Sequence, residues 1–155
     1  MLNTTDLPSI TELLNLTDKV AVVTGGAVGV GYAISRRLAQ SGALVIIADI
    51  DAEKARQASD DLNLEGLHTF PFNCDVSHEQ SVNQMMNTVV SKRGSLDILV
   101  NNAGIFPRRP LTEMSGEEFD RVLTINLKGA FMCSREAAKQ MIIRRTGGCI
   151  INVAS

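Results

Sequence analysis

The chain has 155 residues, a formal net charge of −2 at pH 7 and 45% hydrophobic residues. This length suffices for one domain with a buried core, and the near-neutral charge gives no electrostatic basis for binding nucleic acid or an anionic membrane. Because the N-terminus lacks a basic segment followed by an apolar one, we expect a cytoplasmic protein without a secretory signal or a membrane span.

The chain order predicts five strands that alternate with four helices, preceded by a polar arm at residues 1–15. Residues 16–155 are expected to form one domain. The strands are predicted at 19–24, 43–49, 68–73, 96–100 and 149–153, and the helices at about 29–41, after 51, after 77 and from 115 to about 145. Near-continuous apolar strands between helices are typical of a parallel sheet that is covered on both faces. We therefore expect a Rossmann-like, doubly wound α/β fold with strand order 3-2-1-4-5, in which Pro71 marks an edge strand.

Several residues predict where helices start and stop. Asp51 is placed to cap the second helix, and Gly42 to end the first. Ser77 with Gln80, and Ser115 with Glu118, have the spacing of capping boxes.

Three cysteines, Cys74, Cys133 and Cys149, stand in apolar or strand-like stretches. We expect buried, reduced thiols. The two histidines, His68 and His78, have no neighbours with metal-ligand spacing, so no metal site is predicted.

A glycine-rich turn, residues 24–31 (Thr-Gly-Gly-Ala-Val-Gly-Val-Gly), joins the first strand to the first helix. The free N–H groups and the positive dipole end of a helix N-terminus favour an anion, and glycine lets phosphates approach the backbone. Such turns also connect strands to helices without any ligand, so the turn alone leaves both interpretations open.

Ligands of doubly wound sheets bind beyond the carboxyl ends of the strands. Five residues follow the predicted strands there, namely Gly25, Asp49, Asp75, Asn101 and Ser155. This coincidence favours a binding site over a simple connecting turn.

Asp49 ends the second strand, 18 residues after Gly31 (49 − 31). A carboxylate at this position can accept hydrogen bonds from the adenosine ribose hydroxyls. It would repel a 2′-phosphate by about 4 kcal/mol per charge pair at 4 Å and an effective dielectric constant of 20. The sequence therefore favours NAD over NADP. Capping of the next helix is the alternative role, for which Asp51 is better placed.

Asp75 and Val76 follow the third strand. Asp75 is placed to accept a hydrogen bond from an adenine amino group, with Val76 against the ring. A simple Asx turn before Ser77 explains the same residues equally well.

Asn126 is a polar residue on the apolar face of the predicted long helix, seven residues after Phe119 (126 − 119). The residues that define this face are Phe119, Val122, Leu123, Ala130 and Ala137. Burial of an unpaired amide costs roughly 1–3 kcal/mol, so Asn126 needs partners. A tie to a neighbouring backbone carbonyl and a polar relay to an active site are two compatible explanations. Ser155, at the end of the last strand, has a hydroxyl that is placed to polarise a substrate carbonyl.

Taken together, these motifs resemble the short-chain dehydrogenase/reductase family over residues 16–155. The matching segments are Thr24-Gly25-x-x-x-Gly29-x-Gly31, Asp49, Asp75-Val76, Asn101-Asn102-Ala103-Gly104, Asn126, and residues 150–155, which end on Ser155. The resemblance implies hydride transfer between a nicotinamide and an alcohol or ketone carbon, and a parent protein that is a homo-oligomer.

The resemblance also assigns roles to individual residues. The implied cofactor-binding residues are Thr24, Gly25, Gly29, Val30, Gly31, Asp49, Asp75, Val76, Asn102, Ala103 and Gly104. Asn126 would hold a proton-relay water, and Ser155 would orient the reacting carbonyl or alcohol.

One feature departs from the family pattern. The family's acid/base tyrosine belongs to a Tyr-x-x-x-Lys motif after the serine, and these 155 residues contain no such motif. The only tyrosine, Tyr32, precedes Arg36 at this spacing, and arginine does not replace the lysine. We therefore expect the N-terminal portion of an NAD-dependent oxidoreductase that is inactive by itself. The alternative is a truncated, non-catalytic module for nucleotide binding or subunit interaction.

Overall fold

Five parallel strands form one sheet in the order β3-β2-β1-β4-β5 in the computed structural model, which describes residues 9–145 and 147–154. The strands are β1 (Val20–Thr24), β2 (Leu44–Asp49), β3 (Thr69–Asn73), β4 (Ile98–Asn101) and β5 (Cys149–Asn152). The predicted order is thus confirmed. Pro71 lies in β3 at the sheet edge, where the missing N–H costs no ladder hydrogen bond.

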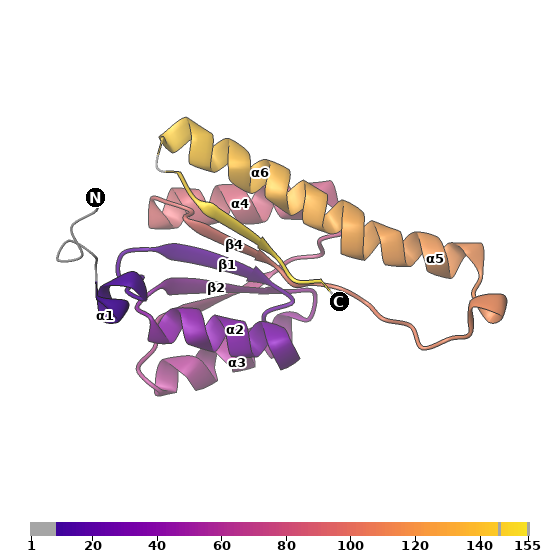
Figure 1. Ribbon diagram of the computed structural model, residues 1–155, viewed down its shortest axis with the longest axis horizontal. Coiled ribbons are helices and arrows are strands. Elements are labelled where there is room, and N and C mark those ends of the chain that lie inside the picture. Colours follow the sequence, from indigo (N-terminus) through magenta and orange to yellow (C-terminus); the bar gives the residue numbers. More distant parts are fainter. Residues whose placement is uncertain (1–8, 146, 155) are drawn as a thin grey trace, which may run out of the picture.

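Helices cover both faces of this sheet. They are α1 (Ile10–Leu13), α2 (Gly29–Gln40), α3 (Ala52–Leu64), α4 (Glu79–Arg93), the 3₁₀ turn η2 (Leu111–Glu113), α5 (Gly116–Leu123), the π-helical η3 (Thr124–Gly129) and α6 (Ala130–Arg144). Helices α2 and α3 lie on one face, and α4 and α6 on the other (Figure 1). No helix in the described ranges is long and apolar enough to cross a bilayer.

Strand β1 shows why the apolar runs are nearly continuous. Val20 and Val22 belong to the core beneath α4 and α6, whereas Ala21 and Val23 belong to the core beneath α2 and α3. Successive side chains point to opposite faces of a sheet, so a strand covered on both faces must be apolar at every position. Met85 and Met86 are fully buried core residues.

Three of the predicted helix signals are confirmed and one is wrong. The Asp51 carboxylate accepts the N–H of Lys54 at 3.1 Å and caps α3. Gly42 follows the C-cap of α2 with φ of 98°, and Ser115 forms the expected capping box with Glu118 on α5.

Ser77 does not cap α4. The N-cap residue is His78, which makes no capping hydrogen bond through its side chain. The Ser77 hydroxyl instead donates to Asp75 Oδ1 at 2.6 Å, within an Asx turn that places Ser77 one residue before the N-cap.

The predicted long helix follows one continuous course but changes its winding at η3 (Figure 1). The prediction of a buried face is wrong at Phe119 and Leu123, which are 52% and 40% exposed. Helix α5 extends beyond the carboxyl ends of the strands, so no strand covers these side chains (Figure 1). Val122, Asn126 and Ala130 are only half-buried, and Ala137 alone of this face is fully buried as expected.

The cysteines differ in burial. Cys74 and Cys133 are buried as predicted, but Cys149 is exposed because it lies on the edge strand β5. Desolvation raises the pKa of Cys133 to about 12, and the charge of the nearby Cys74 acts in the same direction. Burial likewise raises the pKa of Cys74.

The difference in burial among the three thiols predicts that only one of them is alkylated in the folded protein. Because the thiolate is the nucleophile, iodoacetamide at pH 8 is expected to modify Cys149 alone in the folded protein, as measured by mass spectrometry. The Cys149→Ser variant should remain unmodified until guanidinium exposes Cys74 and Cys133. Modification of either buried thiol at the rate of Cys149 would contradict the assignment.

Candidate functional site

The glycine turn after β1 depends on the close approach of its backbone segments. Gly25 and Gly29 have φ values of 60° and 57°, in the left-handed region that favours glycine. A β-carbon on Gly31 would lie 2.0 Å from the Gly25 carbonyl oxygen and 2.5 Å from Asn102 Nδ2. No side chain fits at Gly31 unless the turn, the helix or both move.

The N-terminus of α2 lies at this turn. Its N-cap, Val28, makes no capping hydrogen bond through its side chain, and its first turn contains no acidic residue. Helices α1, α3 and α5 are capped by Ser9, Asp51 and Ser115, and α4, which also lacks a side-chain cap, has acidic Glu79 in its first turn. The orphan N–H groups and the positive dipole end of α2 therefore fit an anionic group such as a phosphate. The Val28 and Val30 side chains are exposed beside them.

Thr24 and Asn102 join the turn to the end of β4. Asn102 Nδ2 donates to the carbonyl oxygens of Thr24 and Gly25, at 3.1 and 3.0 Å. Thr24 Oγ1 accepts the N–H groups of Asn102 and Ala103, at 3.1 and 3.2 Å, and donates to the Val100 carbonyl at 3.2 Å. These bonds fix Asn102 and the predicted residue Ala103 next to the glycine turn.

Asn101 joins three elements, which sequence reasoning did not foresee. Its Nδ2 donates to Ser134 Oγ on α6 at 2.8 Å and to Asn152 Oδ1 on β5 at 2.9 Å. Its buried Oδ1 has no hydrogen-bond partner among the described residues. Asn101 and Asn152 are direct neighbours in the parallel register of β4 and β5. Knowledge of this register would have predicted the hydrogen bond between them.

Asp49 lies at the end of β2, beside the glycine turn. Its Oδ2 accepts the N–H of Ala27 at 3.3 Å, and its Oδ1 accepts the N–H of Asp51 at 3.1 Å. Asp49 therefore does not cap α3, a role that Asp51 fills. The carboxylate borders the turn on the side of β2.

Asp75 forms the Asx turn that the sequence left open. Its Oδ1 accepts the Ser77 N–H at 2.9 Å, and its Oδ2 lies 3.0 Å from His78 Nδ1. Desolvation of Asp75 is outweighed by hydrogen bonds from Ser77 and then His78, which together hold the pKa of this carboxyl below its ordinary value. Val76 is only 8% exposed and packs against Gly129 at the end of η3.

Asn126 lies in η3, and both polar atoms of its side chain form hydrogen bonds with the backbone of Ile105. Its Oδ1 accepts the Ile105 N–H at 2.9 Å, and its Nδ2 donates to the Ile105 carbonyl at 3.0 Å. The predicted tie to neighbouring backbone is thus present. The π-helical winding itself, which often marks functional sites, was not predicted.

The structure brings most of the predicted residues together through these contacts. The turn contacts Asn102, Asp49 contacts the turn through Ala27, and Gly104 approaches Asn126. Ser155 lies outside the described residues. No group of three or more His, Cys, Asp or Glu side chains within the described part of the chain is arranged to hold a metal ion.

A doubly wound sheet with an uncapped helix after a glycine turn, and a carboxylate at the end of the second strand, is typical of nucleotide-binding α/β proteins. The family follows from comparison with known proteins. The chain matches the short chain dehydrogenase family over residues 19–155, and it belongs to this family. The members of the family are oxidoreductases that generally use NAD(P).

Individual relatives agree with this assignment. The chain is 43% identical to an uncharacterized oxidoreductase of Thermotoga maritima over 140 residues, which cover 90% of this chain and 54% of the relative. It is 41% identical to a mitochondrial borneol dehydrogenase of Lavandula x intermedia over 147 residues, 94% of this chain and 54% of the relative. The chain thus spans about half the length of both relatives.

A solved structure shows the same fold. The crystal structure of a short-chain type dehydrogenase/reductase from Mycobacterium marinum has a TM-score of 0.92 and 32% sequence identity to this chain. The match covers 96% of this chain and 60% of that one.

Proposed function

We propose that the protein is an NAD-dependent oxidoreductase that acts on an alcohol or ketone carbon of a small molecule. The observation that carries this proposal is the uncapped N-terminus of α2 beside a glycine turn that Asn102 braces from β4. When bound, the cofactor supplies the hydride acceptor or donor. The chain's own residues would bind the dinucleotide and orient the reacting groups.

The proposed cofactor-binding residues would contact different parts of the dinucleotide. The turn with Thr24, Gly25, Gly29, Val30 and Gly31 would hold the pyrophosphate, and Asp49 the adenosine ribose. Asp75 and Val76 would contact the adenine, while Asn102, Ala103 and Gly104 would border the cofactor along β4. The support for these roles is the continuous set of contacts from Asp49 through Ala27 and the turn to Asn102.

Asp49 is the basis for proposing NAD rather than NADP. A 2′-phosphate on the ribose would add negative charge beside a carboxylate that already lies against the turn. The turn residues 25–30 contain no basic side chain to compensate, and Lys54 on α3 is paired with Asp51 at 2.9 Å.

The Asp49→Ala substitution is expected to abolish the preference for NAD over NADP. In calorimetric titrations, the wild-type chain should bind NAD at least about tenfold more tightly than NADP, a difference of about 1.4 kcal/mol or more. Asp49→Ala should bind NAD more weakly and bring the two affinities within a few-fold of each other. Asp61→Ala, which removes an exposed carboxylate from α3, is the matched control and should behave as wild type. A folded wild-type chain that binds neither dinucleotide would refute the cofactor role.

For the chemical step, we propose roles for Asn126 and Ser155. Asn126, held by Ile105, would position a water for proton transfer, and the Ser155 hydroxyl would orient the substrate oxygen. The 155 residues contain no Tyr-x-x-x-Lys motif, so by themselves they should bind cofactor without turnover. A measurable rate with NAD and a secondary alcohol would contradict this. The alternative is a non-catalytic nucleotide-binding or subunit-interaction module.

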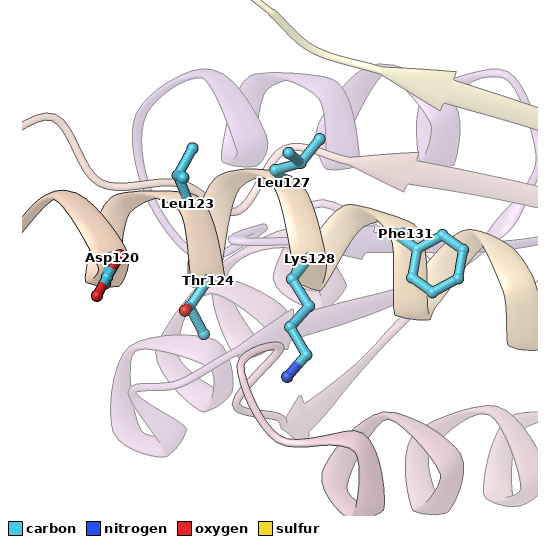
Figure 2. A pocket seen from close by; sticks show the side chains of 6 residues that line it. All are labelled: Asp120, Leu123, Thr124, Leu127, Lys128 and Phe131. Atoms are coloured by element: carbon cyan, nitrogen blue, oxygen red, sulfur yellow. The ribbon is translucent and has the colours of Figure 1, made fainter.

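A homo-oligomer is part of the same proposal, and the outer face of α5, η3 and α6 supports it. This face has a shallow hollow of about 640 Å³ away from the glycine turn, lined by Asp120, Leu123, Thr124, Leu127, Lys128 and Phe131. Figure 2 shows Asp120, Thr124 and Lys128 on successive turns of the helix. Two copies packed antiparallel about Thr124 would pair Asp120 of each with Lys128 of the other, as a two-fold interface requires.

We also propose a cytoplasmic location. Its support is the presence of free cysteines, which are typical of a reducing compartment.

A further inference from the structure

Gly129, the last residue of η3, is buried against the loop that follows β3. A β-carbon built on Gly129 would lie 2.9 Å from Cγ2 of Val76, and 3.2 Å from both Cβ and the carbonyl oxygen of Val76. These separations are shorter than a normal carbon–carbon contact of about 3.5–4.0 Å. The absence of a side chain at Gly129 therefore allows η3 and the loop to meet.

Val76 has little freedom to retreat from such a β-carbon. It is a β-branched residue with a restricted χ1, and it is buried in the core beneath α4 and α6. The loop backbone before it is anchored, because the Cys74 N–H donates to the Asp49 carbonyl at 2.9 Å and the Asp75 N–H donates to Ser81 Oγ at 3.0 Å. Added volume at Gly129 would thus press on the segment that carries Asp75.

The other side of this contact is also fixed. Asn126, three residues before Gly129, is bound to both backbone polar groups of Ile105. The short segment η3 therefore contacts the loop after β4 at one end and the loop after β3 at the other. Both sides of the contact are therefore held, so a β-carbon at Gly129 would strain the Asp75–Val76 loop as well as η3.

We propose that Gly129 is a positioning residue for the adenine half of the cofactor site. It acts through Val76, and its missing side chain holds Asp75 and Val76 where an adenine ring can reach them. This inference rests on the proposed function, because Asp75 and Val76 are the residues assigned there to adenine. A glycine that served packing alone would affect stability without affecting one half of the dinucleotide selectively.

The test compares two fragments of the dinucleotide by calorimetric titration. ADP-ribose contains the adenine, and nicotinamide mononucleotide does not. Gly129→Ala should weaken binding of ADP-ribose about tenfold, equivalent to 1.4 kcal/mol, and leave binding of the mononucleotide within twofold of wild type. Gly116→Ala is the matched control, because a β-carbon at Gly116 of α5 meets no atom within 4 Å. It should bind both fragments as wild type does.

A double-mutant cycle with Val76→Ala tests the proposed route. Val76→Ala removes the methyl group that Gly129→Ala would meet, so the effect of Gly129→Ala on ADP-ribose should shrink to twofold or less in this background. If Gly129→Ala does not fold, the double variant Gly129→Ala/Val76→Ala, which lacks the 2.9 Å contact, must fold and bind ADP-ribose as Val76→Ala does.

Each contrary outcome has a distinct meaning. Equal losses for both fragments, normal ADP-ribose binding by Gly129→Ala, or an undiminished effect in the Val76→Ala background would overturn the role of Gly129 and leave the cofactor proposal intact. A folded wild-type chain that binds neither fragment would refute the cofactor proposal and this inference with it.

Discussion

Gly31→Ala is expected to abolish dinucleotide binding and to destabilise the fold. The new β-carbon would lie 2.0 Å from the carbonyl oxygen and 2.8 Å from the carbonyl carbon of Gly25. Both are backbone atoms, and the Gly25 carbonyl is held by Asn102 at 3.0 Å, so the clash cannot be relieved by a side-chain rotation. Overpacking of this kind typically costs about 1–3 kcal/mol, and we expect the upper end of that range or more.

The loss of binding has the same cause. Alanine would separate the first turn of α2 from the glycine turn, and the N–H groups of the helix would no longer converge on one point. We expect the affinity for NAD to fall at least about a hundredfold, or 2.7 kcal/mol, in calorimetric titration. Urea denaturation measures the stability loss. Gly116→Ala is again the control, and a Gly31→Ala variant that matched it in both measurements would contradict this account of the turn.

The fold was predictable because its signals are local and repeat along the chain. Val20 to Val23 are all apolar, which requires cover on both faces of a strand, and alternation with helices then requires parallel neighbours. Pro71 excludes a central position for its strand. Asp51 and Ser115 cap their helices through contacts within three residues, so no tertiary information is needed.

The failures concern residues whose partners lie elsewhere in the structure. Ser77 has the spacing of a helix cap, but the Asx turn of Asp75 delays the helix start to His78. Phe119 and Leu123 follow the helical period, yet the sheet does not reach them. Cys149 was expected to be buried, but its strand is at the edge that the predicted strand order already gave it, and its side chain is exposed there. In each case the pattern predicts the element correctly, and the surroundings decide the exposure or the partner.

For the candidate site, the sequence predicted which residues need partners but not which partners they have. The sequence identified Asn126 as a residue in need of partners, because a buried amide must be satisfied. The identity of the partner, Ile105, depends on the course of the loop after β4, which no local pattern specifies. The pairing of Thr24 with Asn102 likewise depends on the adjacency of β1 and β4.

Asn126→Asp is expected to destabilise the protein in a pH-dependent way. A carboxylate at this position still accepts the Ile105 N–H, but it presents negative charge to the Ile105 carbonyl oxygen, to which Asn126 Nδ2 donates at 3.0 Å. An unsatisfied acceptor costs roughly 1–3 kcal/mol when buried and less at this half-buried pair, and charge repulsion adds to the cost at neutral pH. We therefore expect a loss of about 1–2 kcal/mol in the free energy of unfolding at pH 7.

The sign of the pH dependence follows from the protonated form of the introduced carboxyl group. A neutral carboxylic acid has an O–H group that can donate to the Ile105 carbonyl, so folding favours the protonated side chain. The pKa of this carboxyl group is therefore higher in the folded variant than in the unfolded chain. Stability is then retained below the unfolded pKa of about 4 and lost as the pH rises through the higher folded pKa. Urea denaturation between pH 4 and 8 should show the variant approaching wild type at the acid end.

Asn87→Asp supplies the matched control for this substitution. Asn87 Oδ1 accepts from Gln140 on the exposed side of α4, and a carboxylate can accept the same hydrogen bond. Its free energy of unfolding should follow wild type across the same pH range. Asn126→Leu, which can neither donate nor accept, should be destabilised without the acid rescue. A loss in Asn126→Asp that did not shrink toward pH 4 would show that the amide is not held by Ile105.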